Sequence, residues 1–205
     1  MGYFAFLALT VLLGVLSLSS LCLPAAAATT QNVSTIAGIL DTCYSILESH
    51  LCSGHKWGKP YHFYRPSIEK YSADQWLWDS GSHMIVWSNR NVSNSILDLR
   101  TMLLMQQPNG RIPEEIFWSD RTAVQNAEIL LQYSSTQFTD TTQMPVLPYS
   151  LRAIAQRSPL PMKKTVIKEF LYPLVNYFKW WRNERDLGDG LVLAIHNWET
   201  GLGNK

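Results

Sequence analysis

The sequence is poor in residues that mark several common classes of protein. It has three cysteines and five histidines in 205 residues, and neither type recurs at the spacing of a metal site. Charged residues make up only 16% of the chain and the net charge is +1, so no basic surface for nucleic acid is indicated. We therefore expect no metal, no cofactor and no nucleic-acid partner.

The cysteines give little reason to expect a disulfide. Cys22 lies in an apolar N-terminal segment, and Cys43 and Cys52 are nine residues apart. On a continuous helix this spacing corresponds to about 2.5 turns and about 13 Å, whereas the Cα atoms of a disulfide lie within about 7 Å of each other. The pair would bridge only if the helix ended before Cys52, and we favour two unpaired thiols.

One apolar run is long enough to concern a membrane. Residues 4–23 are almost wholly apolar, and small residues at the spacing of a signal-peptidase site follow them. We expect residues 1–28 to be a signal peptide that directs the chain to the secretory pathway, in the extracellular space or an endomembrane lumen. A signal anchor is the alternative, because about 20 apolar residues can span a bilayer, but Pro24 and the following alanines favour cleavage near Ala28. The mature chain is then not expected to contact a membrane.

Residues 29–205 are sufficient for one domain with a hydrophobic core. They contain two Asn-Val-Ser triplets, which begin at Asn32 and Asn91. Such triplets accept glycans on the surface loops of secreted proteins, so both asparagines are predicted glycosylation sites.

Apolar residues recur at helical spacing over most of the mature chain. Ser34 is the predicted N-cap of a helix with an apolar stripe over residues 36–51. The aromatic, glycine- and proline-rich residues 53–67 indicate a loop, and only residues 191–195 resemble a short strand. Pro173 should kink or break the last helix. We expect an all-α fold of about six helices, the later ones over residues 75–89, 93–107, 122–133, 145–156 and 162–185.

Tryptophan is abundant, with eight residues, and four of these lie beside carboxylates or at helix ends. An aromatic face beside acceptor carboxylates suits a sugar, whose C–H face stacks on the ring while its hydroxyls donate hydrogen bonds. Filling gaps between helices is the alternative, and we expect it for Trp87, Trp180 and Trp181. The candidates for sugar contact are Trp76, Trp78, Trp118 and Trp198.

Several acidic residues are candidates for the two carboxyl groups, in different environments, that glycoside hydrolysis requires. Glu114 and Glu115 follow Pro113, where a helix start alone would favour acidic residues. Asp186 and Asp189 are expected to shape a turn. The full set of candidates is Asp79, Glu114, Glu115, Asp120, Asp186, Asp189 and Glu199.

Four motifs occur in the order and spacing of the six-hairpin glycosidases. They are QWLWDSGSHMIVWS at 75–88, LLMQQPNGRIPEEIFW at 103–118, TTQMPVLPYSL at 141–151 and RDLGDGLVLAIHNWETG at 185–201. The chain resembles the family 63-like branch, which includes mannosylglycerate and glucosylglycerate hydrolases. The resemblance implies the N-terminal part of an (α/α)6 toroid, a sugar pocket formed by loops at one end of the inner helices, and an inverting mechanism.

The resemblance also implies roles for individual residues. Asp79 matches a carboxylate that binds hydroxyls of the sugar in the cleaved subsite, and Gln143 matches a glutamine that contacts the same sugar. Trp198 and Glu199 match the beginning of the motif that carries the general acid. The predicted substrate contacts are Trp76, Trp78, Asp79, Trp118, Gln143, Trp198 and Glu199.

The chain departs from the family pattern at the position of the general acid. Gly203 stands where the catalytic aspartate is expected, and glycine has no proton to donate. Loss of that group should slow hydrolysis by about 10² to 10⁴-fold or more. Asn197 and Met144 stand where the family often has proline, which are milder changes. About six helices would make half a toroid, so we expect the half that carries the general base to be absent from this chain and an apolar flank to be exposed.

We therefore expect a glycoside hydrolase relative of carbohydrate metabolism whose reaction is inverting hydrolysis of an α-glucoside or α-mannoside such as a glycosylglycerate. As written, the chain should be truncated and inactive. The alternative is a non-catalytic, sugar-binding half-toroid that pairs with a partner chain. A helical enzyme such as a terpene cyclase would need an aspartate-rich metal motif, and the sequence has none.

Overall fold

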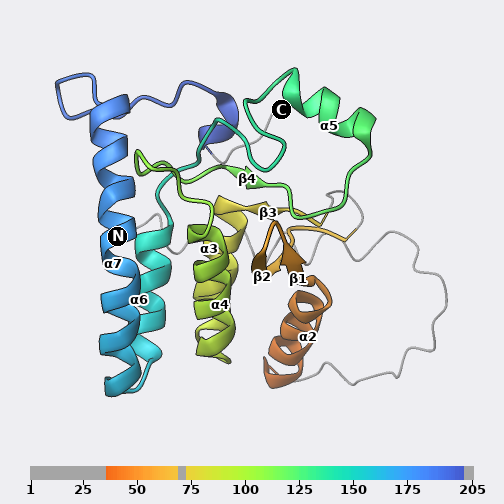
Figure 1. The fold of residues 1–205 in the computed structure, drawn as a ribbon. Helices are drawn as coiled ribbons and strands as arrows, with labels where there is room; N and C mark the ends of the chain where they lie inside the picture. Colours follow the sequence, from red (N-terminus) through yellow and green to blue (C-terminus); the bar gives the residue numbers. More distant parts are fainter. Residues whose placement is uncertain (1–35, 69–72, 201–205) are drawn as a thin grey trace. The chain divides into compact units, whose positions relative to one another are not determined.

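The computed structural model describes residues 36–68 and 73–200, which form two compact units divided after Thr42 (Figure 1). The predicted signal peptide, Ser34, Asn32 and Gly203 lie outside the described residues. In its described part, the first unit is the start of helix α2 (Ile36–Ser49). The second unit contains the remaining elements.

Five further α-helices and a short 3₁₀ helix follow α2, so the described chain is mostly helical, as expected. Helices α3, α4, α6 and α7 pack side by side, and Figure 1 shows irregular segments lying across one end of them. The helices are α3 (Leu77–Trp87), α4 (Val92–Leu103), α5 (Ala123–Leu130), α6 (Leu147–Arg157), α7 (Leu160–Arg185) and η1 (Asn197–Thr200).

Local side chains set several of the helix ends. The Asn91 side chain caps α4 by accepting a hydrogen bond from the backbone N–H of Ser93 at 3.1 Å. Thr122 and Gln125 form a reciprocal capping box at the start of α5. Helix α7 continues through Pro173, so this proline does not break the helix.

Residues 51–64 form a β-hairpin, so the prediction of a loop at 53–67 was wrong over most of its length. Strand β1 (Leu51–Lys56) pairs antiparallel with β2 (Lys59–Tyr64). The two-residue turn places Trp57 at φ 52° and Gly58 at φ 72°, as a hairpin turn with two left-handed residues requires. Tryptophan is an unusual residue for that conformation, so the turn signal was missed.

Cys43 and Cys52 are free thiols, as predicted, although the reasoning behind that prediction was wrong. Helix α2 ends at Ser49, and Cys52 lies on strand β1 rather than on the same helix as Cys43. The condition that would have allowed a disulfide is therefore met, and the two thiols still remain unpaired.

A second pair of short strands replaces two other predicted features. Strand β3 (Gln75–Trp76) pairs antiparallel with β4 (Glu115–Ile116), so α3 begins two residues later than expected. Glu115 thus belongs to a strand, and the helix start suggested after Pro113 is wrong. The strand suggested at residues 191–195 is reduced to a single bridge between Asp186 and Val192.

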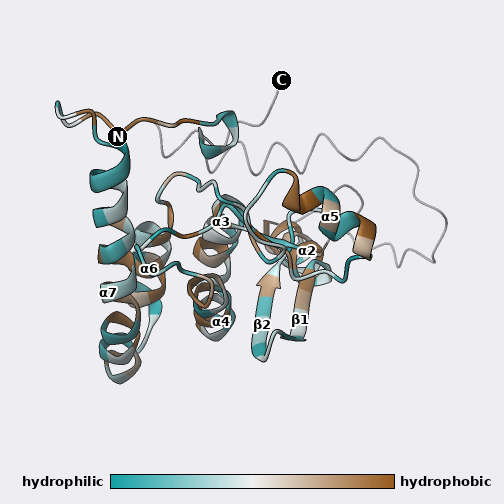
Figure 2. Cartoon of the chain, turned by 45° about the horizontal axis from the view of Figure 1, so that its top comes forward, coloured by the Kyte–Doolittle hydropathy of each residue, from teal (hydrophilic) through white to brown (hydrophobic). Residues whose placement is uncertain are grey.

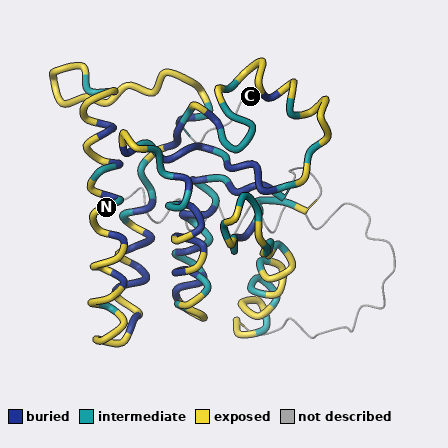
Figure 3. Tube along the Cα trace, in the orientation of Figure 1, coloured by how far each residue is buried: buried dark blue, intermediate teal, exposed yellow. Residues whose placement is uncertain are grey.

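The hydrophobic core lies between α3, α4, α6 and α7. Trp87, Trp180 and Trp181 are at most 5% exposed and belong to this core, which confirms their predicted role in packing. Figure 3 shows that the buried residues of α6 and α7 follow one side of each helix while the other side is exposed. No helix among the described residues is long and apolar enough to cross a membrane.

Two of the exposed apolar regions among the described residues lie on or directly after α7. One is a groove of about 400 Å³ along α6 and α7, with Leu171 and Ile167 in its lining. The other is the segment between α7 and η1, drawn in brown in Figure 2, where Leu191, Val192 and Ile195 are exposed. The expectation of an exposed apolar flank therefore agrees with the described residues.

Candidate functional site

Gln143 joins two parts of the predicted sugar site. Its side-chain oxygen accepts a 2.8 Å hydrogen bond from the backbone N–H of Trp78, in the first turn of α3. Its side-chain nitrogen donates a long hydrogen bond, 3.5 Å, to the backbone carbonyl of Trp198 in η1. One amide thus connects two segments that are far apart in the sequence and that both carry candidate sugar contacts.

The backbone beside Gln143 is held by α7. The hydroxyl of Tyr177 donates to the carbonyl of Gln143 at 2.5 Å and lies 2.8 Å from the hydroxyl of Thr142. The Thr142 hydroxyl also bonds to the carbonyl of Ile112 at 2.6 Å. Because burial raises the pKa of Tyr177, its hydroxyl keeps its proton and stays a donor.

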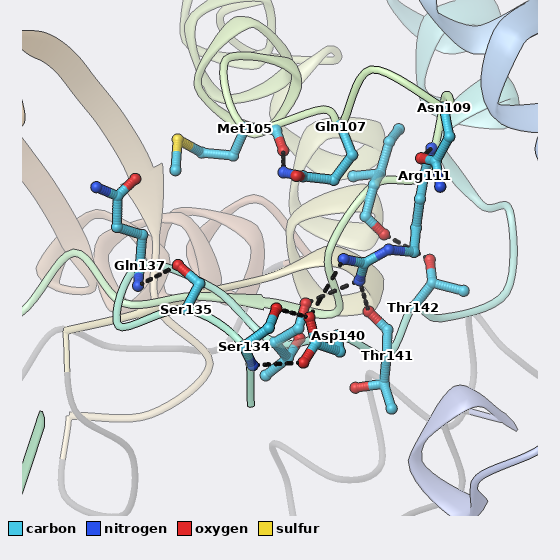
Figure 4. Close-up of polar contacts among 12 residues, drawn as sticks. Met105, Gln107, Asn109, Arg111, Ser134, Ser135, Gln137, Asp140, Thr141 and Thr142 are labelled. Carbon is cyan, nitrogen blue, oxygen red and sulfur yellow. Dashed lines mark hydrogen bonds and ion pairs between the residues drawn. The ribbon is translucent and has the colours of Figure 1, made fainter. Parts of the chain in front are cut away.

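The loop that leads to Gln143 is organised by Arg111 (Figure 4). The Arg111 guanidinium donates to the carbonyls of Thr139 and Thr141, at 2.8 and 3.0 Å, and lies 3.7 Å from the Asp140 carboxylate. Asp140 in turn accepts hydrogen bonds from the backbone and the hydroxyl of Ser134. A single cation therefore fixes the shape of residues 134–142.

Two tryptophan rings contact each other edge to face at this site. The rings of Trp76 and Trp198 lie 6.3 Å apart between centroids, with an interplanar angle of 61°. The Trp198 ring also contacts the ring of His196 edge to face, at 5.5 Å. Trp76 comes from strand β3 and Trp198 from η1, so the pair spans the same two regions that Gln143 connects.

Asp79 is the carboxyl group best placed to act as an acceptor at this site. It lies in the first turn of α3, one residue after Trp78, and is half-buried. Burial raises its pKa to about 6, against a smaller lowering effect of a hydrogen bond from its own backbone N–H. At neutral pH it is therefore largely ionised, as an acceptor for sugar hydroxyls should be.

Glu115 lies on strand β4, and the backbone carbonyl of Glu114 accepts a 2.8 Å hydrogen bond from the N–H of Leu77. Glu114 has no exposed surface, and burial raises its pKa to about 7, with the Glu199 carboxylate adding to the shift. Burial likewise raises the pKa of Glu115 to about 8. A carboxyl without exposed surface does not reach a substrate in this arrangement, so Glu114 is not a candidate for direct catalysis here.

Glu199 was predicted to contact the sugar, and the structure places it in the interior. It has no exposed surface. One carboxylate oxygen accepts a hydrogen bond from the Arg185 guanidinium at 3.0 Å, and the other accepts from the backbone N–H of Ile195 at 2.7 Å. Both oxygens therefore have partners within the chain.

Other predicted residues lie elsewhere. Trp118 is 2% exposed, stacks on Tyr61 of the hairpin at 5.0 Å, and donates from its ring nitrogen to Gln75 at 3.1 Å. Asn91 is exposed at the start of α4, and its glycosylation stays a prediction. No group of His, Cys, Asp and Glu in the described part of the chain is arranged to hold a metal ion.

The turn predicted around Asp186 and Asp189 is confirmed. The Asp186 carboxylate accepts hydrogen bonds from the backbone of Gly188 and Gly190, at 2.8 and 3.3 Å. Asp189 accepts one from Leu191 at 2.9 Å. Arg185, Tyr177 and Arg111, which hold the site together, were missed, because a lone polar residue on a helix or in a loop carries no pattern that indicates its partner.

The comparisons with known proteins all indicate the same family. The family model described as "Mannosylglycerate hydrolase MGH1-like glycoside hydrolase domain" matches residues 71–204. The chain is 26% identical over 136 residues to a mannosylglycerate hydrolase of Thermus thermophilus, and 28% identical over 134 residues to mannosylglycerate hydrolase MGH1 of Selaginella moellendorffii. These matches cover 63% of this chain but only 33% and 28% of the two relatives.

Solved structures resemble the chain in fold. A GH63 mannosylglycerate hydrolase of Thermus thermophilus, in complex with Tris and D-glycerate, superposes with a TM-score of 0.64 at 21% sequence identity. The match covers 80% of this chain and 38% of that one. A complex of the same enzyme with glucose gives a TM-score of 0.63. The expectation of part of an (α/α)6 toroid is thereby confirmed, and the chain spans about a third of the length of these relatives.

Proposed function

Because the chain belongs to the mannosylglycerate hydrolase MGH1-like glycoside hydrolase family, we propose that it binds the sugar of a glycosylglycerate. The observation that carries this proposal is that Gln143 joins Trp78, the residue before Asp79, to Trp198, whose ring in turn contacts that of Trp76. Asp79 accepts hydrogen bonds from sugar hydroxyls, and the two indole rings contact the apolar face of the sugar. Trp78 adds a further wall.

The reaction we propose for the complete enzyme is inverting hydrolysis of an α-mannoside or α-glucoside. This mechanism requires an acid that protonates the leaving oxygen and a base that activates water, about 6.5–9.5 Å apart. Of the carboxyl groups nearest this site, Glu114 and Glu199 have no exposed surface, which leaves Asp79. We assign Asp79 to sugar binding, and we propose that the described residues supply binding without the acid and base.

The second candidate function is that of a non-catalytic sugar-binding half, completed by a partner chain. The exposed apolar groove along α6 and α7 supports it, because a soluble surface rarely leaves such a patch uncovered. Light scattering of the purified chain tests this idea. We expect association that the substitution Leu171→Glu abolishes, and a monomer at all concentrations would contradict it.

Calorimetry and a hydrolysis assay with mannosylglycerate and glucosylglycerate test the main proposal. We expect binding without turnover. Asp79→Asn should weaken binding by about tenfold or more, because the substitution removes hydrogen bonds between the carboxylate and the sugar hydroxyls. Asp120→Asn is the matched control, since the Asp120 side chain is fully exposed in an ion pair with Lys56. Turnover by the chain would refute the expected inactivity, and absence of binding would refute the proposal itself.

The secretory route is a further proposal. The apolar residues 4–23 and the small residues that follow support cleavage near Ala28. N-terminal sequencing of the protein secreted by a eukaryotic host tests it, and we expect a start close to residue 29. Mass loss on removal of N-glycans, reduced by Asn91→Gln, would report a glycan at Asn91.

A further inference from the structure

Glu199 forms a buried ion pair with Arg185, 3.0 Å long, across a loop of the chain. The Arg185 side chain is 13% exposed, and its guanidinium also lies 4.8 Å from the centroid of the Trp180 ring. The backbone N–H of Ile195 completes the set of donors around the carboxylate. Because a buried charge must be paired and hydrogen bonded, this arrangement fixes Glu199 tightly in one place.

The backbone around Glu199 is bonded to a second segment of the chain. The backbone carbonyl of Glu199 accepts a 3.1 Å hydrogen bond from the N–H of Met144. The residues that precede Met144 and Glu199 are joined as well, because the Gln143 side chain bonds to the carbonyl of Trp198. Residues 143–144 and 198–199 are therefore held together at two consecutive positions.

The residue whose orientation depends on this connection is Trp198. Its indole ring faces Trp76 at 6.3 Å and is also contacted by the ring of His196. An aromatic ring contributes to ligand binding in full only when it is already oriented in the free protein. The interactions of Glu199 supply that orientation through the backbone that carries the ring.

We propose that Glu199 is a positioning residue: its carboxylate, held by Arg185 and Ile195, places Trp198 opposite Trp76 and does not itself touch the sugar. The part of this inference that concerns sugar rests on the proposed function. The part that concerns the orientation of Trp198 rests only on the contacts around Glu199. The two parts are measured separately.

Fluorine NMR of the chain labelled with fluorotryptophan reports the orientation of Trp198, whose resonance is identified by its loss in Trp198→Phe. Glu199→Gln keeps the size of the side chain and removes its charge. We expect the Trp198 resonance to shift and broaden, and the affinity for mannosylglycerate to fall on the order of 10- to 100-fold, because a misplaced contact group is costly. The matched control is Glu169→Gln, since Glu169 lies on the exposed surface of α7 and pairs with Arg100 at 2.6 Å.

A double variant separates positioning from stability. Arg185→Met combined with Glu199→Gln removes the unpaired guanidinium, so the melting temperature should recover relative to Glu199→Gln alone. The resonance of Trp198 should stay displaced and the affinity should stay low. If affinity recovers together with melting temperature, Glu199 serves only stability and the proposal is refuted. The double variant also provides the measurement if Glu199→Gln alone does not fold.

The remaining outcomes are equally decisive. A weaker affinity with an unchanged Trp198 resonance would mean that Glu199 contacts the sugar directly, which overturns the inference. An unchanged resonance and unchanged affinity would overturn it as well. If the resonance moves as expected but the unaltered chain binds no glycosylglycerate, the positioning role of Glu199 stands and the proposed function fails.

Discussion

The helices and the loops across their ends are held together by different interactions. Helices α3, α4, α6 and α7 share a core of apolar side chains. The loop layer, which we define as residues 105–122, 131–146 and 186–200, depends on a few polar side chains, namely Arg111, Gln143 and Glu199. Many interchangeable contacts stabilise the helices, whereas single hydrogen-bonding groups determine the loop layer. Trp198 and Gln143, which are predicted to contact the sugar, lie in the loop layer.

The largest effect is expected inside the helical core. Leu174→Ala removes a side chain that is 4% exposed on α7, and it should lower the free energy of unfolding by about 2–5 kcal/mol. Leu171→Ala, on the same helix but 51% exposed, should cost less than about 1 kcal/mol. Urea unfolding of the two variants measures the difference. Equal costs would mean that the exposed side of α7 is covered in solution.

A slightly smaller effect is expected where the loop layer meets α7. Gly110 has φ +98°, and a Cβ atom there would lie 2.5 Å from the backbone oxygen of Asn176. Gly110→Ala should therefore cost about 2–4 kcal/mol, the sum of backbone strain and steric overlap. Gly188 has φ +88° and open space around it, so Gly188→Ala should cost about 1 kcal/mol. Thermal unfolding distinguishes the two, and similar melting temperatures would show that the contact with Asn176 does not constrain the loop.

The hydroxyl of Tyr177 links helix α7 to the loop layer, so its loss should destabilise the loop layer more than the helices. Tyr177→Phe leaves the carbonyl of Gln143 without its 2.5 Å hydrogen bond and should cost about 1–3 kcal/mol. Hydrogen exchange should accelerate first at residues 142–146. Tyr172→Phe is the control, because Tyr172 is 69% exposed on the same helix. Uniform acceleration over both regions would contradict the separation between them.

The remaining effect is a change in pH dependence within the helices. Burial raises the pKa of Asp98 to about 8 in the folded chain, above its ordinary value of 3.8, while the Gln75 amide bonds to it at 2.8 Å. Between these values the unfolded chain has lost a proton that the folded chain keeps. Asp98 therefore makes stability fall as pH rises towards 8, with a slope of at most about 1.4 kcal/mol per pH unit.

Asp98→Asn cannot titrate, so its free energy of unfolding should fall less between pH 5 and pH 8 than that of the unaltered chain. His83, whose pKa burial lowers to about 4, has the opposite sign at lower pH, but it is present in both proteins and cancels in the difference. Asp120→Asn should leave the slope unchanged. Parallel curves for Asp98→Asn and the unaltered chain would show that Asp98 is ionised in the fold.

The difference between the helices and the loop layer also explains what could be predicted from the sequence. Apolar periodicity predicted α6 and α7 with ends within two residues of those observed, because burial of one helix face leaves a pattern in the sequence. The hairpin at residues 51–64 was missed because its turn uses Trp57 at positive φ. Local sequence carries information about local structure only where common residues occupy their usual conformations.

The candidate site shows a different limit. The resemblance of the motifs brought Asp79, Gln143 and Trp198 to attention, and the Gln143 side chain bonds to Trp198 and to Trp78, the residue before Asp79. The motif did not reveal that Glu199 is buried, since its partner Arg185 lies 14 residues earlier and meets it only after the turn at Gly188 and Gly190. Whether a motif residue faces a ligand or the interior depends on such partners.

The role of Asp79 in sugar binding is tested most directly by a crystal structure of the chain with mannosylglycerate. We expect a sugar within hydrogen-bonding distance of the Asp79 carboxylate, with the rings of Trp76 and Trp198 against it. Glu199 should remain bonded to Arg185, as in the free chain. A sugar bound at another place, or held by Glu199 while Asp79 makes no contact with it, would contradict this role of Asp79.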